Sequence, residues 1–149
     1  MTVEDNITFS AAEISIIVHA TENQDKILQS INDVLSISPN RFTSNSSEGH
    51  WGNKIFILSA VISSAEANSL ISKILSKLNK IDRQSLSDFF DHYIDEKGNL
   101  YIRLDKQKIC QGRTSLSDND SIRIRLRPVR KYKPTRILEN YRRLLTSSE

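Results

Sequence analysis

Cysteine, glycine and proline are scarce in this 149-residue chain, which has one, four and three of them respectively. Cys110 has no second cysteine to pair with, so the chain cannot form an internal disulfide, which suits a reducing compartment. No apolar run approaches the roughly 20 residues of a membrane-spanning helix. The first residues, MTVEDNITFS, lack the basic and apolar regions of a signal peptide. These absences predict a cytoplasmic protein without a membrane partner.

Motifs for enzymatic chemistry are also missing. The chain contains no G-x-x-x-x-G-K, G-x-G-x-x-G or G-x-S-x-G pattern. His19, His50 and His92 are far apart and form no close pair with one another or with Cys110 of the kind that binds zinc. Cys110 is predicted to be a small, neutral core residue rather than a nucleophile. We therefore expect no catalytic residue, no metal ion and no cofactor, and a protein that is not an enzyme.

The order of hydrophobic patterns predicts an α+β domain. Strand patterns occupy residues 13–20, 54–61, 100–105 and 121–127, with weaker ones at 41–47 and 108–113, and helical patterns occupy 22–35, 63–80, a segment starting at 82, and 136–145. Adjacent strands near each end favour a two-layer domain, with an antiparallel or mixed sheet and helices packed on one face. We divide the chain into a flexible leader, 1–11, a single domain, 12–128, and a basic C-terminal extension with a helix, 129–149.

Two strand-like runs, LYIRLD at 100–105 and SIRIRLR at 121–127, alternate strictly between apolar and polar residues. In a strand, this alternation places the aliphatic side chains on one face. The opposite face carries Tyr101, Arg103, Arg123, Arg125 and Arg127. Guanidinium groups beside an aromatic ring suit RNA or single-stranded nucleic acid, because they bind phosphates while unpaired bases stack on the ring. The alternative is a solvated face whose charge serves solubility and protects an edge.

Positive charge is concentrated near the C-terminus. Residues 123–143 hold nine basic residues and one acid, whereas the rest of the chain holds 12 basic and 17 acidic residues. Local charge density governs phosphate binding, so this segment extends the predicted RNA surface. It adds Arg130, Lys131 and Lys133 to the strand arginines and to Lys106. The alternative function is a protein-interaction module that docks an acidic partner through the same segment.

The loop EGHWGN at 48–53 holds the only tryptophan and two of the four glycines. Two interpretations stay open for it. His50 and Trp51 could stack on or hydrogen-bond an unpaired base, which would make them part of the RNA surface. Alternatively, Trp51 could fill the core while the glycines form a tight turn, since tryptophan is buried on average.

Four segments together resemble a known archaeal family. They are HATEN at 19–23, EGHWGN at 48–53, DEKGNLYIRLDKQ at 95–107 and GRTSLSDNDSIRIRLR at 112–127. The family consists of small proteins described as predicted exosome subunits or exosome-associated RNA-binding proteins. The resemblance implies a fold similar to that of the large-subunit ribosomal protein that binds five-S rRNA. It also implies RNA binding in or near the RNA-processing machinery, with exosome or ribosome-associated proteins as possible partners.

The resemblance assigns no RNA-contact role to individual residues. The matching positions can therefore serve the fold as easily as the function. They are His19, Glu22, His50, Gly52, Asp105, Lys106 and Gln107.

Overall fold

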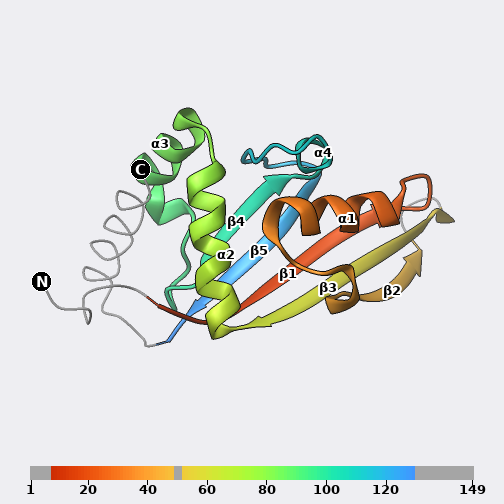
Figure 1. The fold of residues 1–149 in the computed structure, drawn as a ribbon, viewed down its shortest axis with the longest axis horizontal. Helices are drawn as coiled ribbons and strands as arrows, with labels where there is room; N and C mark the ends of the chain where they lie inside the picture. Colours follow the sequence, from red (N-terminus) through yellow and green to blue (C-terminus); the bar gives the residue numbers. More distant parts are fainter. Residues whose placement is uncertain (1–7, 49–51, 130–149) are drawn as a thin grey trace, which may run out of the picture. The chain divides into compact units, whose positions relative to one another are not determined.

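The computed structural model describes residues 8–48 and 52–129. They form an α+β fold, in which four helices pack against a five-stranded antiparallel sheet with the order β2-β3-β1-β5-β4 (Figure 1). The strands are β1 (Phe9–His19), β2 (Thr43–Glu48), β3 (Lys54–Ser63), β4 (Leu100–Asp105) and β5 (Ser121–Pro128). The helices are α1 (Gln24–Leu35), α2 (Ser64–Lys77), α3 (Lys80–Asp88) and α4 (Lys106–Cys110), with the 3-10 turns η2 (Pro39–Arg41) and η4 (Phe90–His92). The predicted fold class is confirmed.

The described chain divides into two compact units, each built from separate stretches of sequence. Unit 1 comprises residues 8–12, 62–102 and 125–129, and unit 2 comprises residues 13–48, 52–61 and 103–124. The boundaries between them fall inside strands β1, β3, β4 and β5.

Unit 2 is organised by alternation along β1. Ile14, Ile16 and Val18 are buried, whereas Ser15, Ile17 and His19 point to the opposite face. Helix α1 lies over the buried face of β1 and next to α4 (Figure 1). Its apolar residues recur at helical spacing and are all buried, which is the pattern of a helix with one core-facing stripe. They are Ile27, Leu28, Ile31, Val34 and Leu35. Strand β2 is exposed along its whole length, and among the described strands it pairs only with β3.

Unit 1 contains α2 and α3 (Figure 1). Asn68 of α2 joins the helix to β1, because its side chain accepts a hydrogen bond from the Phe9 N–H and donates one to the Phe9 carbonyl. The turn before β4 is built around Asp95, whose carboxylate accepts hydrogen bonds from the N–H groups of Lys97 and Asn99 and from the Tyr101 hydroxyl. Gly98 has φ +85 in this turn, a conformation that favours glycine.

Most predicted elements are confirmed within a few residues, and two local predictions are wrong. Residues 108–113 are not a strand, because Asp105 accepts a hydrogen bond from the Lys108 N–H and caps the short helix α4. The helix predicted to start at residue 82 begins instead at Lys80, because Asn79 caps it and accepts a hydrogen bond from the Asp82 N–H. No helix in the described parts of the chain is long and apolar enough to cross a membrane. The predicted C-terminal helix lies outside the described residues.

Candidate RNA-binding surface

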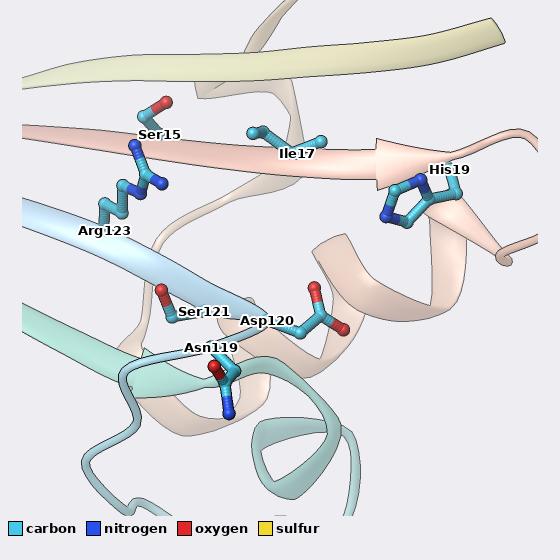
Figure 2. Close-up of a pocket in the computed structure, with 7 residues that line it drawn as sticks. All are labelled: Ser15, Ile17, His19, Asn119, Asp120, Ser121 and Arg123. Atoms are coloured by element: carbon cyan, nitrogen blue, oxygen red, sulfur yellow. The ribbon is translucent and has the colours of Figure 1, made fainter. Parts of the chain in front are cut away.

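A pocket of about 510 Å³ opens on the outward face of the sheet in unit 2. Strand β1 contributes Ser15, Ile17 and His19, which are the residues that its alternation turns away from the core. The other lining residues come from β5 and the turn before it, and are Asn119, Asp120, Ser121 and Arg123. Figure 2 shows Arg123 extending towards Ser15 at one end, with the Asp120 carboxylate closer to His19 at the other.

A buried lysine lies beneath the Asp120 end of this pocket. The side chain of Lys106 is 0% exposed, and its ammonium group donates to the Ile17 carbonyl at 2.9 Å. It also contacts Glu22 Oε1 and Asp120 Oδ1, each at 2.8 Å. An ammonium group has three N–H donors, so these three oxygens satisfy it completely. Lys106 therefore links β1, the turn before α1 and the turn before β5.

The ionisation of this cluster follows from its contacts. Burial opposes the charge on Lys106, but the carboxylates of Asp120 and Glu22 outweigh it and raise the pKa of Lys106 above its ordinary value of 10.5. Burial likewise opposes ionisation of Glu22, but the hydrogen bonds from the His19 N–H and from Lys106 lower the pKa of Glu22 below 4.5. The contacts of the cluster therefore favour the charged forms of Lys106 and Glu22.

Neighbouring polar side chains reinforce the cluster. The Gln107 amide donates to Glu22 Oε2 at 3.3 Å and lies 3.5 Å from Asp120 Oδ2. Asp105 caps α4, the helix that carries both Lys106 and Gln107. The family-like segments around Glu22, Asp105, Lys106 and Gln107 thus meet in space, and the contacts they make hold the fold together at this point.

Arg103 on β4 and Arg123 on β5 carry exposed positive charge in unit 2. The Lys106 N–H donates to the Asp120 carbonyl and continues the ladder between β4 and β5. Following that antiparallel register back by three residues places Arg103 directly opposite Arg123, on the face away from the core. Neither guanidinium group makes a hydrogen bond or ion pair with any residue in the described ranges 8–48 and 52–129. Like charges that face each other across two strands are destabilising unless an anion lies near them.

The remaining predicted site residues lie in other surroundings. Tyr101 in unit 1 is 39% exposed and its hydroxyl is bound to Asp95, at 2.9 Å. Arg125 is partly buried and Arg127 is exposed, and both make contacts within the protein. His50, Trp51, Arg130, Lys131 and Lys133 lie outside the described residues.

Two features of this surface differ from the sequence-based expectation. Lys106 was grouped with the phosphate-binding residues, but the structure places its ammonium group inside the protein with three partners. The pocket also includes residues that sequence reasoning did not select: Ser15, Ile17, Asn119, Asp120 and Ser121. The signals in the sequence were the outward face of β1 and the turn residues Asp118, Asn119 and Asp120, but neither signal indicates a ligand by itself.

Among residues 8–48 and 52–129, no three histidine, cysteine, aspartate or glutamate side chains come together as a possible set of metal ligands. Cys110 is partly buried and unpaired with any other cysteine.

Comparison with known proteins agrees with the chemistry of this surface. A family model described as RNA binding matches residues 11–127. The RNA-binding protein PAB1135 of Pyrococcus abyssi is 32% identical over 114 residues, covering 73% of this chain and 74% of that protein.

Crystal structures of archaeal proteins share the fold. Protein AF2318 from Archaeoglobus fulgidus is 26% identical, with a TM-score of 0.74 over 94% of this chain and 98% of that one. Protein SSO0741 from Sulfolobus solfataricus is 27% identical, with a TM-score of 0.72 over 93% of this chain and 99% of that one. Because the RNA-binding family model spans most of the described residues, this chain belongs to that family.

Proposed function

We propose that this protein is a non-enzymatic RNA-binding protein that works in the cytoplasm, in or near the RNA-processing and degradation machinery. Arg103 and Arg123 on the outward face of unit 2 bind RNA phosphates, and the pocket beside Arg123 receives part of the same RNA. The name of the Pyrococcus relative, an RNA-binding protein, and the family match support RNA as the ligand. Association with the exosome or with ribosome-associated proteins rests on the sequence resemblance alone.

The observation that carries this proposal is the arginine pair. Two exposed guanidinium groups face each other across β4 and β5, and no described residue neutralises either of them. A protein that needed charge only for solubility would gain more by alternating its signs, because opposed like charges repel. A polyanion removes that repulsion and releases its own counterions on binding.

Positive charge elsewhere in the chain extends the contact. Arg127 is exposed on β5 in unit 1, and Arg130, Lys131 and Lys133 follow it in the sequence. We assign them phosphate contacts that add to affinity without choosing a sequence. Arg125, which is partly buried, and Tyr101, whose hydroxyl is bound to Asp95, have smaller roles in this proposal.

The test is RNA binding measured across a salt series by fluorescence anisotropy, with single-stranded and structured RNAs. We expect affinity to fall as salt rises. In Arg103→Ala/Arg123→Ala, the slope of log affinity against log salt should be smaller by roughly 1.4, since each phosphate contact with a single strand contributes about 0.7. Arg113→Ala is the matched control, because Arg113 is exposed in the same unit but bound to Gln111.

The outcomes separate the candidate functions. An unchanged slope in the double variant would remove these two arginines from the interface, and no binding at low salt would end the RNA proposal. Co-purification from cell lysate, with and without nuclease, then identifies protein partners. Partners that survive nuclease bind the protein directly, as an acidic docking partner would, whereas exosome components lost after nuclease are bridged by RNA.

A further inference from the structure

The pocket beside Arg123 has two chemically different ends. At one end lies the guanidinium group of Arg123, which no described residue neutralises, and at the other lie the Asp120 carboxylate, a hydrogen-bond acceptor, and the His19 ring (Figure 2). Ile17, which is 36% exposed, provides an apolar surface on the strand between them. A volume of about 510 Å³ lies within the range of small-molecule sites, roughly 300–1,000 Å³. Such a pocket suits a ligand with an anionic group and a flat ring that carries donors.

The Asp120 carboxylate is held in place by the interior of the protein. Its Oδ1 contacts Lys106 Nζ at 2.8 Å, and Lys106 is itself anchored to the Ile17 carbonyl. The Asp120 side chain nevertheless remains 48% exposed. A buried, fully bonded lysine therefore fixes the position of a carboxylate that still faces the solvent.

Asp120 has unused capacity to accept hydrogen bonds. Within the described residues its Oδ2 receives only the long contact from Gln107, at 3.5 Å. Glu22 differs, because its carboxylate is mostly buried and accepts from His19 N–H, Lys106 and Gln107. Since Lys106 can neutralise only one of the two carboxylates, the remaining negative charge is most accessible at Asp120. This end of the pocket repels phosphate and attracts N–H donors.

We propose that the pocket binds one unpaired guanine of an RNA strand, an inference that rests on the proposed RNA-binding function. Asp120 accepts hydrogen bonds from guanine N1–H and the N2 amino group, while Arg123 contacts a phosphate of the same strand. Guanine is the only RNA base whose Watson–Crick edge presents two adjacent N–H donors, which match the two oxygens of one carboxylate. The flat base lies against Ile17 and His19, as unpaired bases in RNA complexes stack on side chains.

The positions of the two charged residues agree with this assignment. Asp120 lies in the turn just before β5 and Arg123 on β5, and three residues of extended chain span roughly 10 Å. That separation lets one end of a nucleotide reach the carboxylate while its phosphate stays near the guanidinium group. The hydroxyl groups of Ser15 and Ser121, between them, can donate to or accept from the sugar or the base.

The experiment compares short oligouridine RNAs that carry one central guanosine, inosine or adenosine, with binding measured by fluorescence anisotropy at low salt. Inosine lacks only the N2 amino group, so it removes one of the two proposed hydrogen bonds. We expect guanosine RNA to bind about tenfold more tightly than inosine RNA, and adenosine RNA to bind no better than inosine RNA. Asp120→Asn should bring the three affinities together, and Asp118→Asn, a neighbouring exposed position, should leave the preference intact.

The possible results distinguish the guanine site from RNA binding in general. Equal affinity for the three RNAs, with the salt dependence and the Arg123 effect retained, overturns the guanine site and leaves the proposed function standing. No binding of any RNA by the wild-type protein overturns both. Because Asp120→Asn also weakens the contact with Lys106, its folding is checked by thermal unfolding, and if it unfolds, the guanosine–inosine ratio of the wild-type protein decides alone.

Discussion

Lys106 and the pair Arg103–Arg123 are basic residues of the same unit, and the fold uses them in opposite ways. Lys106 is completely buried and gives its three donors to Ile17, Glu22 and Asp120. The two arginines are exposed and have no partner in the described ranges of the chain. One basic group therefore holds the floor of the pocket together, and the other two remain available to a ligand. The three groups carry the same sign of charge, so their position relative to the core decides how the fold uses them.

The largest effect is expected at Lys106. Lys106→Met keeps an unbranched side chain but leaves Glu22 and Asp120 without their shared cation. Removing one partner of a fully buried ion pair costs about 3–5 kcal/mol. Because Asp120 keeps 48% of its side chain in water, which screens its charge, we expect a smaller loss of about 2–3 kcal/mol in the free energy of unfolding. Urea denaturation measures it.

The control for this change is Lys108→Met on the same helix. The Lys108 side chain makes no hydrogen bond or ion pair in the described residues, and we expect a change within about 0.5 kcal/mol. If the two variants lose equal stability, the distinction between a structural lysine and a surface lysine on α4 is wrong.

A smaller effect is expected from the pH dependence of the same cluster. The pKa of Glu22 is lower in the folded protein than its ordinary value of 4.5, so ionised Glu22 stabilises the fold above that pH. This contribution is lost as the pH falls through the folded-state pKa. The pKa of Lys106 is raised above 10.5, so its contribution is complete below that pH and is lost as the pH rises through the folded-state pKa.

The variant Glu22→Gln tests the predicted loss of stability at low pH. The variant should lose less stability than the wild type when the pH is lowered from 5 to about 3, because it has no carboxylate to protonate at this position. Glu96→Gln, at an exposed turn position, controls for the change in net charge. Chemical denaturation at several pH values makes the comparison, and parallel curves for the wild type and Glu22→Gln would show that this carboxylate does not couple to folding.

The fold was predictable because its signals are local. Strict alternation in β4 and β5, and helical spacing in α1, identify the apolar face of each element from nearby residues alone. The apolar face of each of these elements is buried, as predicted. The short helix α4 was missed because five residues hold too little periodic pattern, and because its beginning depends on the Asp105 cap rather than on an apolar stripe.

The candidate site was only partly predictable. Arg103 and Arg123 were selected because alternation alone places them on the open face. Lys106 was assigned to the surface because its charge suggested exposure, whereas its partners Glu22 and Asp120 lie 84 and 14 residues away in the sequence. Such long-range pairing leaves no trace in hydrophobic spacing. The role of Asp120 in the pocket depends on that pairing, so it too needed the structure.

The smallest effect concerns the arginine pair in the absence of RNA. If Arg103 and Arg123 face each other without a counterion, removing either one should relieve repulsion and raise the free energy of unfolding by a few tenths of a kcal/mol. In a double-mutant cycle of Arg103→Ala and Arg123→Ala, the second substitution should therefore gain less than the first, and the coupling should shrink as salt rises. If the stability effects of the two substitutions are additive at low salt, the two guanidinium groups do not repel each other measurably. The phosphate contacts would then have to be assigned to each arginine separately, because a strand of RNA could bind one without bridging to the other.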